Sequence, residues 1–316
     1  SFPVLTLQTG KIGFLIVASF TLLAWLFKKW FKYIVIFTLI ILISITWLQR
    51  WPGGDWQVAN CDIGQGDSMV INLGNHRGIV IDVGPDAVAE DRCLKALGIK
   101  EIPLLILSHF HADHVAGLPG ALKRRTVGQV WVSVNSAPLV ESAMAGSALA
   151  GVEMIKAVRG MSSRVGPLTI KVLWPTLSAT SFEEMPGDGS QINNSSIATL
   201  ITSNEFSIFA GGDLEPPVQE ILVKDISPVD IYKVCHHGSR YQDLAFMSAL
   251  HPRISIISVG AGNTYGHPAV QTLDALTRLG SEVLRTDIDG AIAVQVRNHQ
   301  FTVRKAKGRF NLIRWG

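Results

Sequence analysis

A short segment rich in metal-ligand side chains follows an apolar run. Three histidines and one aspartate fall within six positions: His109, His111, Asp113 and His114. Residues 104–107 before them are typical of a buried strand, and a helix is predicted to begin near His114. Because side chains alternate along extended chain, His109 and His111 point to one side. Imidazoles and a carboxylate gathered in this way suit zinc, manganese or iron, and two ligand pairs so close can hold two metals.

The elements around this segment predict an α/β fold. Short strands separated by turns are predicted at 58–63, 68–73 and 78–83, as an antiparallel meander, and strands then alternate with helices in two halves of similar order. Such halves suggest a four-layer sandwich whose strand ends meet in the middle. The HxHxDH pattern between a strand and a helix resembles the signature of the metallo-β-lactamase fold, an αββα sandwich, which agrees with the order of predicted elements.

The same resemblance extends to two later motifs. In "FAGGD" it implies that Asp213 is a carboxylate bridging both metals. "KVCHHGS" follows another predicted strand and supplies the last histidine ligand. We expect His236, nearest the strand end, to be that ligand and His237 to serve substrate or proton transfer, although the order of the two stays open.

One ligand of the resembling fold is missing. No histidine occurs between His114 and His236, and the segment where it is expected reads "INNSSI". Asn194, or a serine such as Ser195, is expected to face the site instead. Amides ligate more weakly than imidazole, so the site shifts toward ions that prefer oxygen. We expect one or two divalent ions, with manganese or zinc favoured and magnesium also compatible.

Five ordered motifs narrow the resemblance. "CDIGQGDS", "IDVGP", "NNSS", "HHGS" and "YGHP" together are similar to the C-terminal domain of the ComEC family of DNA internalisation proteins, over residues 56–293. The resemblance implies a nuclease that degrades the strand that is not imported during natural transformation. It also implies the partners: single-stranded DNA, the lipid bilayer, a preceding channel region of the same protein, and other competence DNA-uptake proteins.

The expected chemistry is phosphodiester hydrolysis. A cation can neutralise the phosphate and lower the pKa of water to about 7, and Asp113, His237 and His267 are the expected catalytic groups, with either histidine assisting the leaving group. Roles at the substrate or in supporting the ligands are expected for Asp62, Gln65, Asp67, Asp82, Asn194, Ser195 and Ser239. Two alternatives remain: a phosphodiesterase acting on cell-envelope or other small diesters, and a non-catalytic module that guides DNA.

The first 50 residues have a different composition. Two apolar runs, 12–27 and 33–48, contain no acid and flank the basic segment "KKWFK". We predict a transmembrane helical hairpin over 1–50 that ends a channel domain, then a linker at 51–56, a hydrolase domain at 57–296 and a basic tail at 297–316. The positive-inside rule puts "KKWFK" in the cytoplasm and the hydrolase outside it, in a multi-pass plasma-membrane protein.

Charge and cysteine content restrict the function further. Residues 51–296 hold 17 basic and 25 acidic residues once the five basic residues before position 51 and the six after position 296 are set aside. An acidic body is a poor general polyanion binder, so any DNA contact should depend on local basic groups and be sensitive to salt. The tail and residues 123–125 are candidates, and the tail could equally face anionic lipid. Cys61, Cys93 and Cys235 form no close pair or CxxC motif and are predicted to be free, mostly buried thiols.

Overall fold

The structure, a computed structural model, describes residues 11–48, 51–177, 182 and 189–307. The chain divides into two compact units, residues 1–50 and 51–316. Each unit is described by itself.

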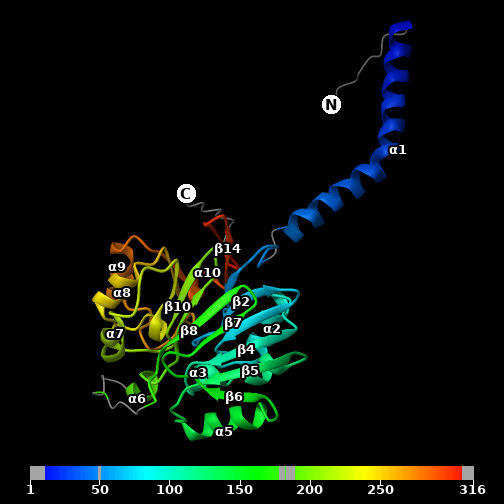
Figure 1. The fold of residues 1–316 in the computed structure, drawn as a ribbon. Coiled ribbons are helices and arrows are strands. Elements are labelled where there is room, and N and C mark those ends of the chain that lie inside the picture. The colour runs from blue at the N-terminus through cyan, green and yellow to red at the C-terminus, as the bar shows by residue number, and fades with distance from the viewer. Residues whose placement is uncertain (1–10, 49–50, 178–181, 183–188, 308–316) are drawn as a thin grey trace. The chain divides into compact units, whose positions relative to one another are not determined.

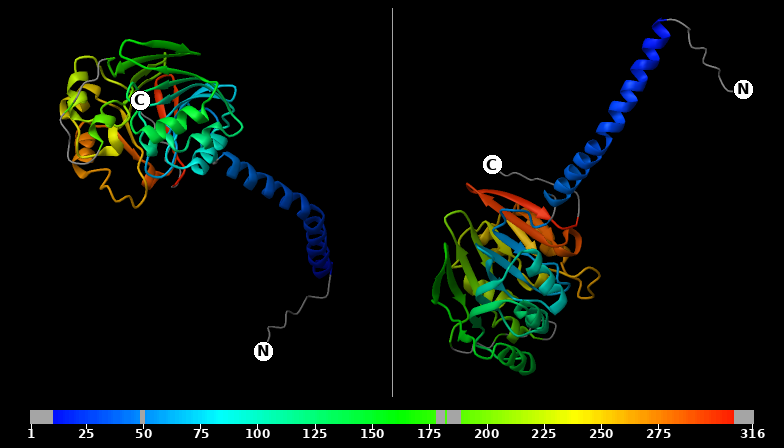
Figure 2. Two further views of the ribbon diagram at one scale, coloured as in Figure 1. Left: turned by 90° about the horizontal axis from the view of Figure 1, so that it is seen from below. Right: turned by 90° about the vertical axis from the view of Figure 1, so that its right-hand side faces the viewer.

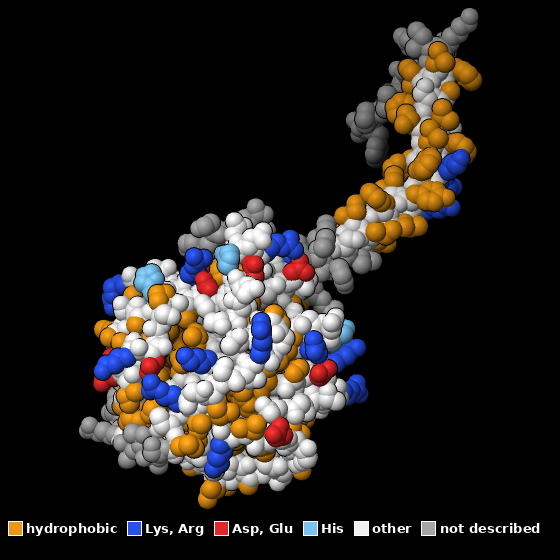
Figure 3. All heavy atoms as spheres, viewed as in Figure 1, with side chains coloured by type: hydrophobic (Ala, Val, Ile, Leu, Met, Phe, Trp, Pro, Cys, Tyr) orange, Lys and Arg blue, Asp and Glu red, His pale blue; other side chains and the backbone are white. Residues whose placement is uncertain are grey.

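Within its described residues, 11–48, the first unit forms one helix where two were predicted. Helix α1 runs without interruption over Lys11–Leu48 and bends part-way along (Figure 1). "KKWFK" lies inside it, because no glycine or proline that could end the helix occurs between Gly13 and Pro52. The stretch Gly13–Leu42 is long and apolar enough to cross a membrane by length and composition. Apolar side chains cover α1, and basic side chains gather at one place along it (Figure 3).

The second unit is built on two sheets. The first has the order β15-β14-β1-β2-β3-β4-β5-β6, with strands β1 (Val58–Asn60), β2 (Met69–Gly74), β3 (Arg77–Ile81), β4 (Glu101–Leu107), β5 (Thr126–Val132), β6 (Glu153–Lys156), β14 (Ile292–Arg297) and β15 (Gln300–Lys305). The second has the order β13-β12-β11-β10-β9-β8-β7, with strands β7 (Ser162–Val165), β8 (Leu168–Trp174), β9 (Ala198–Thr202), β10 (Ser207–Ala210), β11 (Ile231–Lys233), β12 (Ile254–Ile257) and β13 (Glu282–Arg285). Strands β1 to β3 pair antiparallel, which confirms the predicted meander.

Helices cover the outer faces of the two sheets (Figures 1 and 2). Beside the first sheet lie α2 (Ala87–Ala96), α3 (Ala112–Val115), α4 (Leu118–Leu122) and α5 (Leu139–Ala148). Later in the chain come α6 (Ser190–Asn193), α7 (Pro216–Leu222), a 3₁₀ turn (Cys235–Gly238), α8 (Leu244–Leu250), α9 (Val270–Arg278) and α10 (Thr286–Asp289). Helices α7, α8 and α9 contribute apolar side chains to the core on the second sheet.

Alternating side chains divide the interior into three cores. In β3, Ile79 and Ile81 belong to the core between the sheets, whereas Val80 packs under the outer helices. In β10 and β11, Ile208 and Ile231 likewise face the central core. Successive side chains of a strand point to opposite faces of its sheet. A strand that is buried on both faces therefore packs on one face against the other sheet and on the other face against the helices. This arrangement confirms the predicted α/β sandwich.

Part of the segment predicted as a basic tail, 297–316, forms a strand. Residues Gln300–Lys305 form β15, which pairs antiparallel with β14 at the edge of the first sheet. Phe301 and Val303 are buried there, which explains why this segment stays on the sheet. Residues 308–316 lie outside the described part of the chain.

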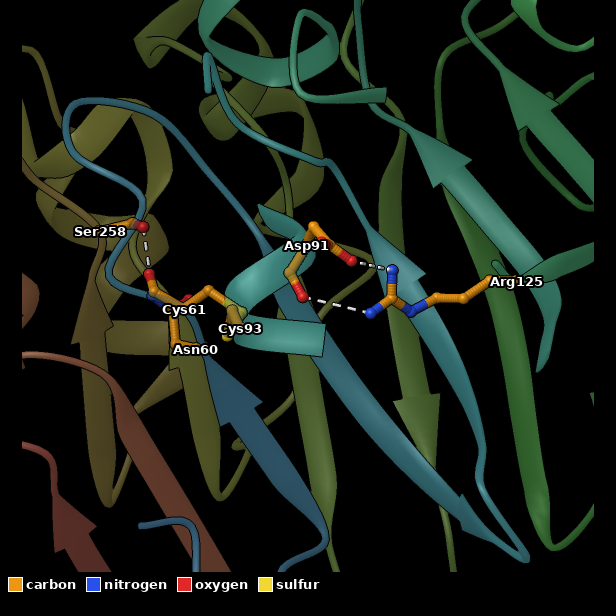
Figure 4. Close-up of a disulfide and its surroundings, with 6 residues drawn as sticks. All are labelled: Asn60, Cys61, Asp91, Cys93, Arg125 and Ser258. Carbon is orange, nitrogen blue, oxygen red and sulfur yellow. Dashed lines mark hydrogen bonds and ion pairs between the residues drawn. A yellow bond between two sulfur atoms is a disulfide. The ribbon is translucent and has the colours of Figure 1, made fainter. Parts of the chain in front are cut away.

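The cysteine prediction was wrong for two of the three residues. Cys61 and Cys93 form a disulfide that ties the end of β1 to α2 (Figure 4). Beside it, Asn60 donates a hydrogen bond to Ser258 of the second half, and Arg125 holds Asp91 of α2. The two cysteines are 32 residues apart, and only packing of α2 on the sheet brings them together. Cys235 is free and buried, as predicted.

This disulfide is expected to stabilise the second unit. A Cys61→Ser, Cys93→Ser double variant should lose about 3 kcal/mol of unfolding free energy, because the unfolded chain gains freedom. Urea denaturation followed by circular dichroism measures the loss. A reductant should destabilise the wild type by a similar amount and leave the double variant unchanged; equal stability of both proteins without reductant would contradict the prediction.

Candidate metal centre

The HxHxDH segment leaves the end of β4 and is fixed there by a buried carboxylate. Asp82 accepts hydrogen bonds from the Ser108 N–H and hydroxyl, both at 2.7 Å. Its Oδ2 also lies 2.9 Å from His114 Nδ1. Asp82 thus holds the end of the strand and orients His114. Because Asp82 contacts Nδ1, the Nε2 atom of that ring points away from Asp82 and is left for another partner.

The ends of β10 and β11 bring two more ligand-type groups to the same place. Asp213 follows β10, and its N–H donates to the hydroxyl of Ser196. His237 follows β11 and directs Nε2 at Asp113 Oδ2, 3.1 Å away, and at Asp213 Oδ2, 3.5 Å away. His114 Nε2 lies 3.3 Å from the same Asp213 oxygen.

These groups form a cluster suited to a cation. Asp113, His114, Asp213 and His237 each offer a ligand atom, and the four atoms lie within 4.8 Å of one another. Within the described chain, His114 Nε2 and Asp213 Oδ1 are buried without a hydrogen-bond partner. Buried polar atoms of this kind need compensation, and two imidazoles with two carboxylates form a donor set that fits a divalent ion.

The two histidines of "HHGS" differ from the expected order. The structure puts His237 in the cluster, while His236 Nδ1 lies 3.4 Å from Glu215. Both residues have positive φ, 48° and 50°, in a turn that follows the strand. Such backbone is unusual outside glycine, and it turns the second imidazole, not the first, toward Asp113. Distance from the strand end was therefore a poor guide.

His109 and His111 form a second group beside the cluster. His109 Nε2 lies 3.0 Å from His111 Nδ1 and 4.0 Å from Asp213 Oδ2. Gly189 lies against the His111 ring, where a Cβ atom would stand 2.7 Å from the ring carbon Cε1. The six predicted ligand residues thus converge, with Asp213 between the two groups and His236 at their edge.

Asp67 supports the cluster from behind through a residue that the sequence analysis missed. Lys233 of β11, 3% exposed, makes a 2.7 Å ion pair with Asp67 Oδ1, which also lies 3.1 Å from His237 Nδ1. His237 Nδ1 lies 3.0 Å from the Ser258 carbonyl as well. These two acceptors favour the proton on Nδ1 and leave Nε2 to face Asp113. A lone lysine inside an apolar strand was the available signal, because a buried charge requires a partner.

In the segment that replaces the missing histidine, Ser196 reaches the site, with its hydroxyl 3.2 Å from His109 Nδ1, whereas Asn194 and Ser195 do not. The Asn193 and Asn194 amides both donate to Glu215, and the Asn194 side-chain oxygen accepts from the Glu215 N–H. Glu215, 3% exposed, in turn contacts His236. The two amides therefore position a carboxylate that the sequence analysis did not single out, although it follows Asp213 by two residues.

Other expected site residues have structural partners. Asp62 pairs with Lys307, and the Gln65 side-chain oxygen accepts from the Gly260 N–H. The hydroxyls of Ser195 and Ser239 form hydrogen bonds with the backbone of their own turns.

Close packing explains the glycine at position 66, where a Cβ atom would stand 2.2 Å from the Asp113 carbonyl oxygen.

Charge compensation shifts the pKa values throughout the cluster. Burial is the largest influence on His114 and His237 and disfavours their charged forms, but the surrounding carboxylates together outweigh it. Asp213 contributes most among these carboxylates, and the pKa of each histidine is raised well above its usual value. Burial is similarly outweighed at Asp67, where Lys233 and His237 lower the pKa to about 2. Burial and the neighbouring His236 lower the pKa of His267 to about 4, so its ring is neutral at pH 7.

Comparison with known proteins agrees with this geometry. Residues 61–192 match the metallo-beta-lactamase superfamily. ComE operon protein 3 of Bacillus subtilis is 31% identical over 266 residues, 77% of this chain and 33% of that protein. Recombination protein 2 of Haemophilus influenzae is 25% identical over 81% of this chain and 31% of its own length. Competence protein ComA of Neisseria gonorrhoeae is 25% identical over 76% of this chain and 32% of its own length.

These matches support a relationship of the chain to ComEC-type competence proteins. The chain spans about a third of the length of the curated relatives it matches. The chain combines the metallo-β-lactamase fold of metal-dependent hydrolases with a His/Asp cluster able to hold a metal.

Metal affinity should fall as the pH is lowered. The raised pKa values mean that His114 and His237 hold protons at neutral pH, and a cation must displace them. Each displaced proton should weaken apparent affinity by about tenfold per pH unit below the raised pKa. Isothermal titration with Mn²⁺ in buffers of different ionisation enthalpy measures both affinity and proton release. Affinity that is independent of pH, with no proton released, would contradict this.

Lys233 should control metal affinity without touching the metal. In Lys233→Ala, Asp67 loses its buried partner and His237 loses part of its orientation, so Mn²⁺ affinity should fall about 10- to 100-fold. Manganese electron paramagnetic resonance gives the free-ion concentration directly. Lys171→Ala, which removes an exposed lysine from β8, is the matched control and should bind as the wild type does. An unchanged affinity in the folded Lys233 variant would refute the role.

Proposed function

We propose that this chain is the metal-dependent nuclease region of a membrane DNA-uptake protein and hydrolyses phosphodiester bonds of the DNA strand that is not imported. The observation that carries the proposal is the cluster of Asp113, His114, Asp213 and His237 in a sequence related to competence proteins. The cluster is the proposed site of catalysis, and the similarity to competence proteins suggests DNA as the substrate.

One or two divalent ions, manganese or zinc, would be held by His114, Asp113, Asp213 and His237, with His109 and His111 for the second. Such an ion supplies charge that neutralises a phosphodiester and lowers the pKa of water. The protein contributes fixed ligands: Asp82 orients His114, and Asp67 orients His237. Ligands held by buried partners cost little reorganisation when an anionic substrate arrives.

His237 and His267 are proposed to have different roles, one in metal binding and the other beside the substrate. As part of the cluster, His237 is better placed to bind metal than to transfer protons. His267 lies outside it, with its ring centroid 6.3 Å from that of His237 and 5.4 Å from that of His236. Its lowered pKa keeps it neutral at pH 7, so it can accept a proton or hydrogen bond beside the substrate but cannot supply a stored positive charge.

We place the hydrolase unit outside the cytoplasm, with α1 as a membrane anchor to the preceding channel region. The Cys61–Cys93 disulfide supports this, because disulfides persist in oxidising compartments and are rare in the cytosol. The disulfide supports this location without reference to the lysines at 28–32, which lie inside a continuous helix and define no loop. Other competence DNA-uptake proteins are the expected partners.

Substituting Asp213 tests the nuclease proposal. In the full chain, Asp213→Ala should reduce Mn²⁺-stimulated cleavage of single-stranded DNA to the level measured without added cation. Asp274→Ala, an exposed aspartate on α9, is the matched control and should cleave as the wild type does. Cleavage is followed on gels with end-labelled oligonucleotide.

The outcomes separate the alternative functions. Wild-type cleavage of small diesters but not of DNA would favour a phosphodiesterase of the same fold. Bound metal without any hydrolysis, together with loss of transformation in Asp213→Ala cells, would favour a non-catalytic module that guides DNA. Either result would overturn the nuclease proposal.

A further inference from the structure

A short loop beside the metal centre is held in one conformation by a single asparagine. The loop joins β12 to α9 and carries the "YGHP" motif. The Asn263 amide donates to the carbonyls of Gly260 and His267, and its side-chain oxygen accepts from the N–H groups of Tyr265 and His267. At one end of the loop the Gly260 N–H donates to the Gln65 side-chain oxygen, and at the other the Ala269 N–H donates to the Gly238 carbonyl.

This loop presents an aromatic ring to solvent. Tyr265 is 69% exposed, and its ring stacks on His267 at a centroid distance of 6.1 Å and an interplanar angle of 29°. His267 is only partly exposed, and its ring also lies next to the His236 ring, at a centroid distance of 5.4 Å. A row of three rings therefore leads from the metal centre to an exposed tyrosine.

The local charge favours an anion next to this row. Arg240 is exposed and directly follows the "HHGS" motif, whose His236 ring lies 5.4 Å from the His267 ring. A cationic headgroup such as choline would be repelled by Arg240, although aromatic rings alone could attract it. A nucleotide combines a flat base with an adjacent phosphate and so matches both features, since single-strand binding sites pair stacking rings with basic groups.

We propose that Tyr265, backed by His267, is a stacking platform for an unpaired nucleobase, and that Arg240 holds the neighbouring phosphate. The inference rests on the proposed nuclease function and adds how the substrate is positioned. A paired base cannot stack on the exposed ring, because its faces are covered by its neighbours. The platform therefore selects single strands and sets which phosphate reaches the cluster.

Binding without metal tests the platform separately from cleavage. The full chain in detergent, with EDTA present, is titrated against an end-labelled short oligothymidylate and against an abasic strand of equal length, by fluorescence anisotropy. The wild type should prefer the base-containing strand by roughly 5- to 150-fold, the range expected for stacking of one base. Tyr265→Ala and Tyr265→Leu should abolish this preference, and Tyr265→Phe, which keeps the ring, should retain it.

Arg240→Ala should weaken both strands alike and reduce the salt dependence of binding, because a phosphate contact is independent of the base. Arg92→Ala, an exposed arginine on α2, is the matched control. A wild type that binds both strands equally, a Tyr265→Leu variant that keeps the preference, or competition by phosphocholine would overturn the proposal. Base preference in a protein that never cleaves DNA would support the platform and refute only the nuclease.

Discussion

Buried negative charge is the constraint on which the rest of the second unit depends. Asp67, Asp82 and Asp213 are nearly or fully buried, and Asp113 is close to them. Carboxylates out of water are costly unless each has a partner. Lys233 and the histidines provide partial compensation, and a divalent cation would complete it. The fold therefore stabilises an arrangement whose charge favours metal binding.

The sandwich supplies the rigidity that this arrangement needs. Asp213 follows β10 and His237 follows β11, two adjacent parallel strands, while Asp113 and His114 follow β4 of the other sheet. The central core between the sheets fixes the distance between these strand ends. Supporting contacts then cross the same gap: Asp67 of the first half pairs with Lys233 of the second. Metal ligands and packing are thus parts of one constraint.

The resulting centre has a buried side and a side that opens to solvent, an arrangement that suits a long substrate. On one side, Asp67 and Asp82 orient the ligand rings from buried positions. On the other, the rings of His236, His267 and Tyr265 lead outward to solvent. An anionic strand would approach from that side, since the acidic body elsewhere repels it. Local basic groups, and not overall charge, would then decide where a strand binds.

Strand periodicity and motif order are local properties, so they were enough to predict the sandwich fold and most of the residues that approach one another. His109, His111, Asp113, His114 and Asp213 converge as their positions after strands implied. The roles of neighbouring residues, by contrast, depend on contacts between distant parts of the chain. The turn geometry selected His237 over His236, and helix packing joined Cys61 to Cys93. Burial gave Lys233 and Glu215 their roles, because a partner from a distant strand is invisible in local sequence.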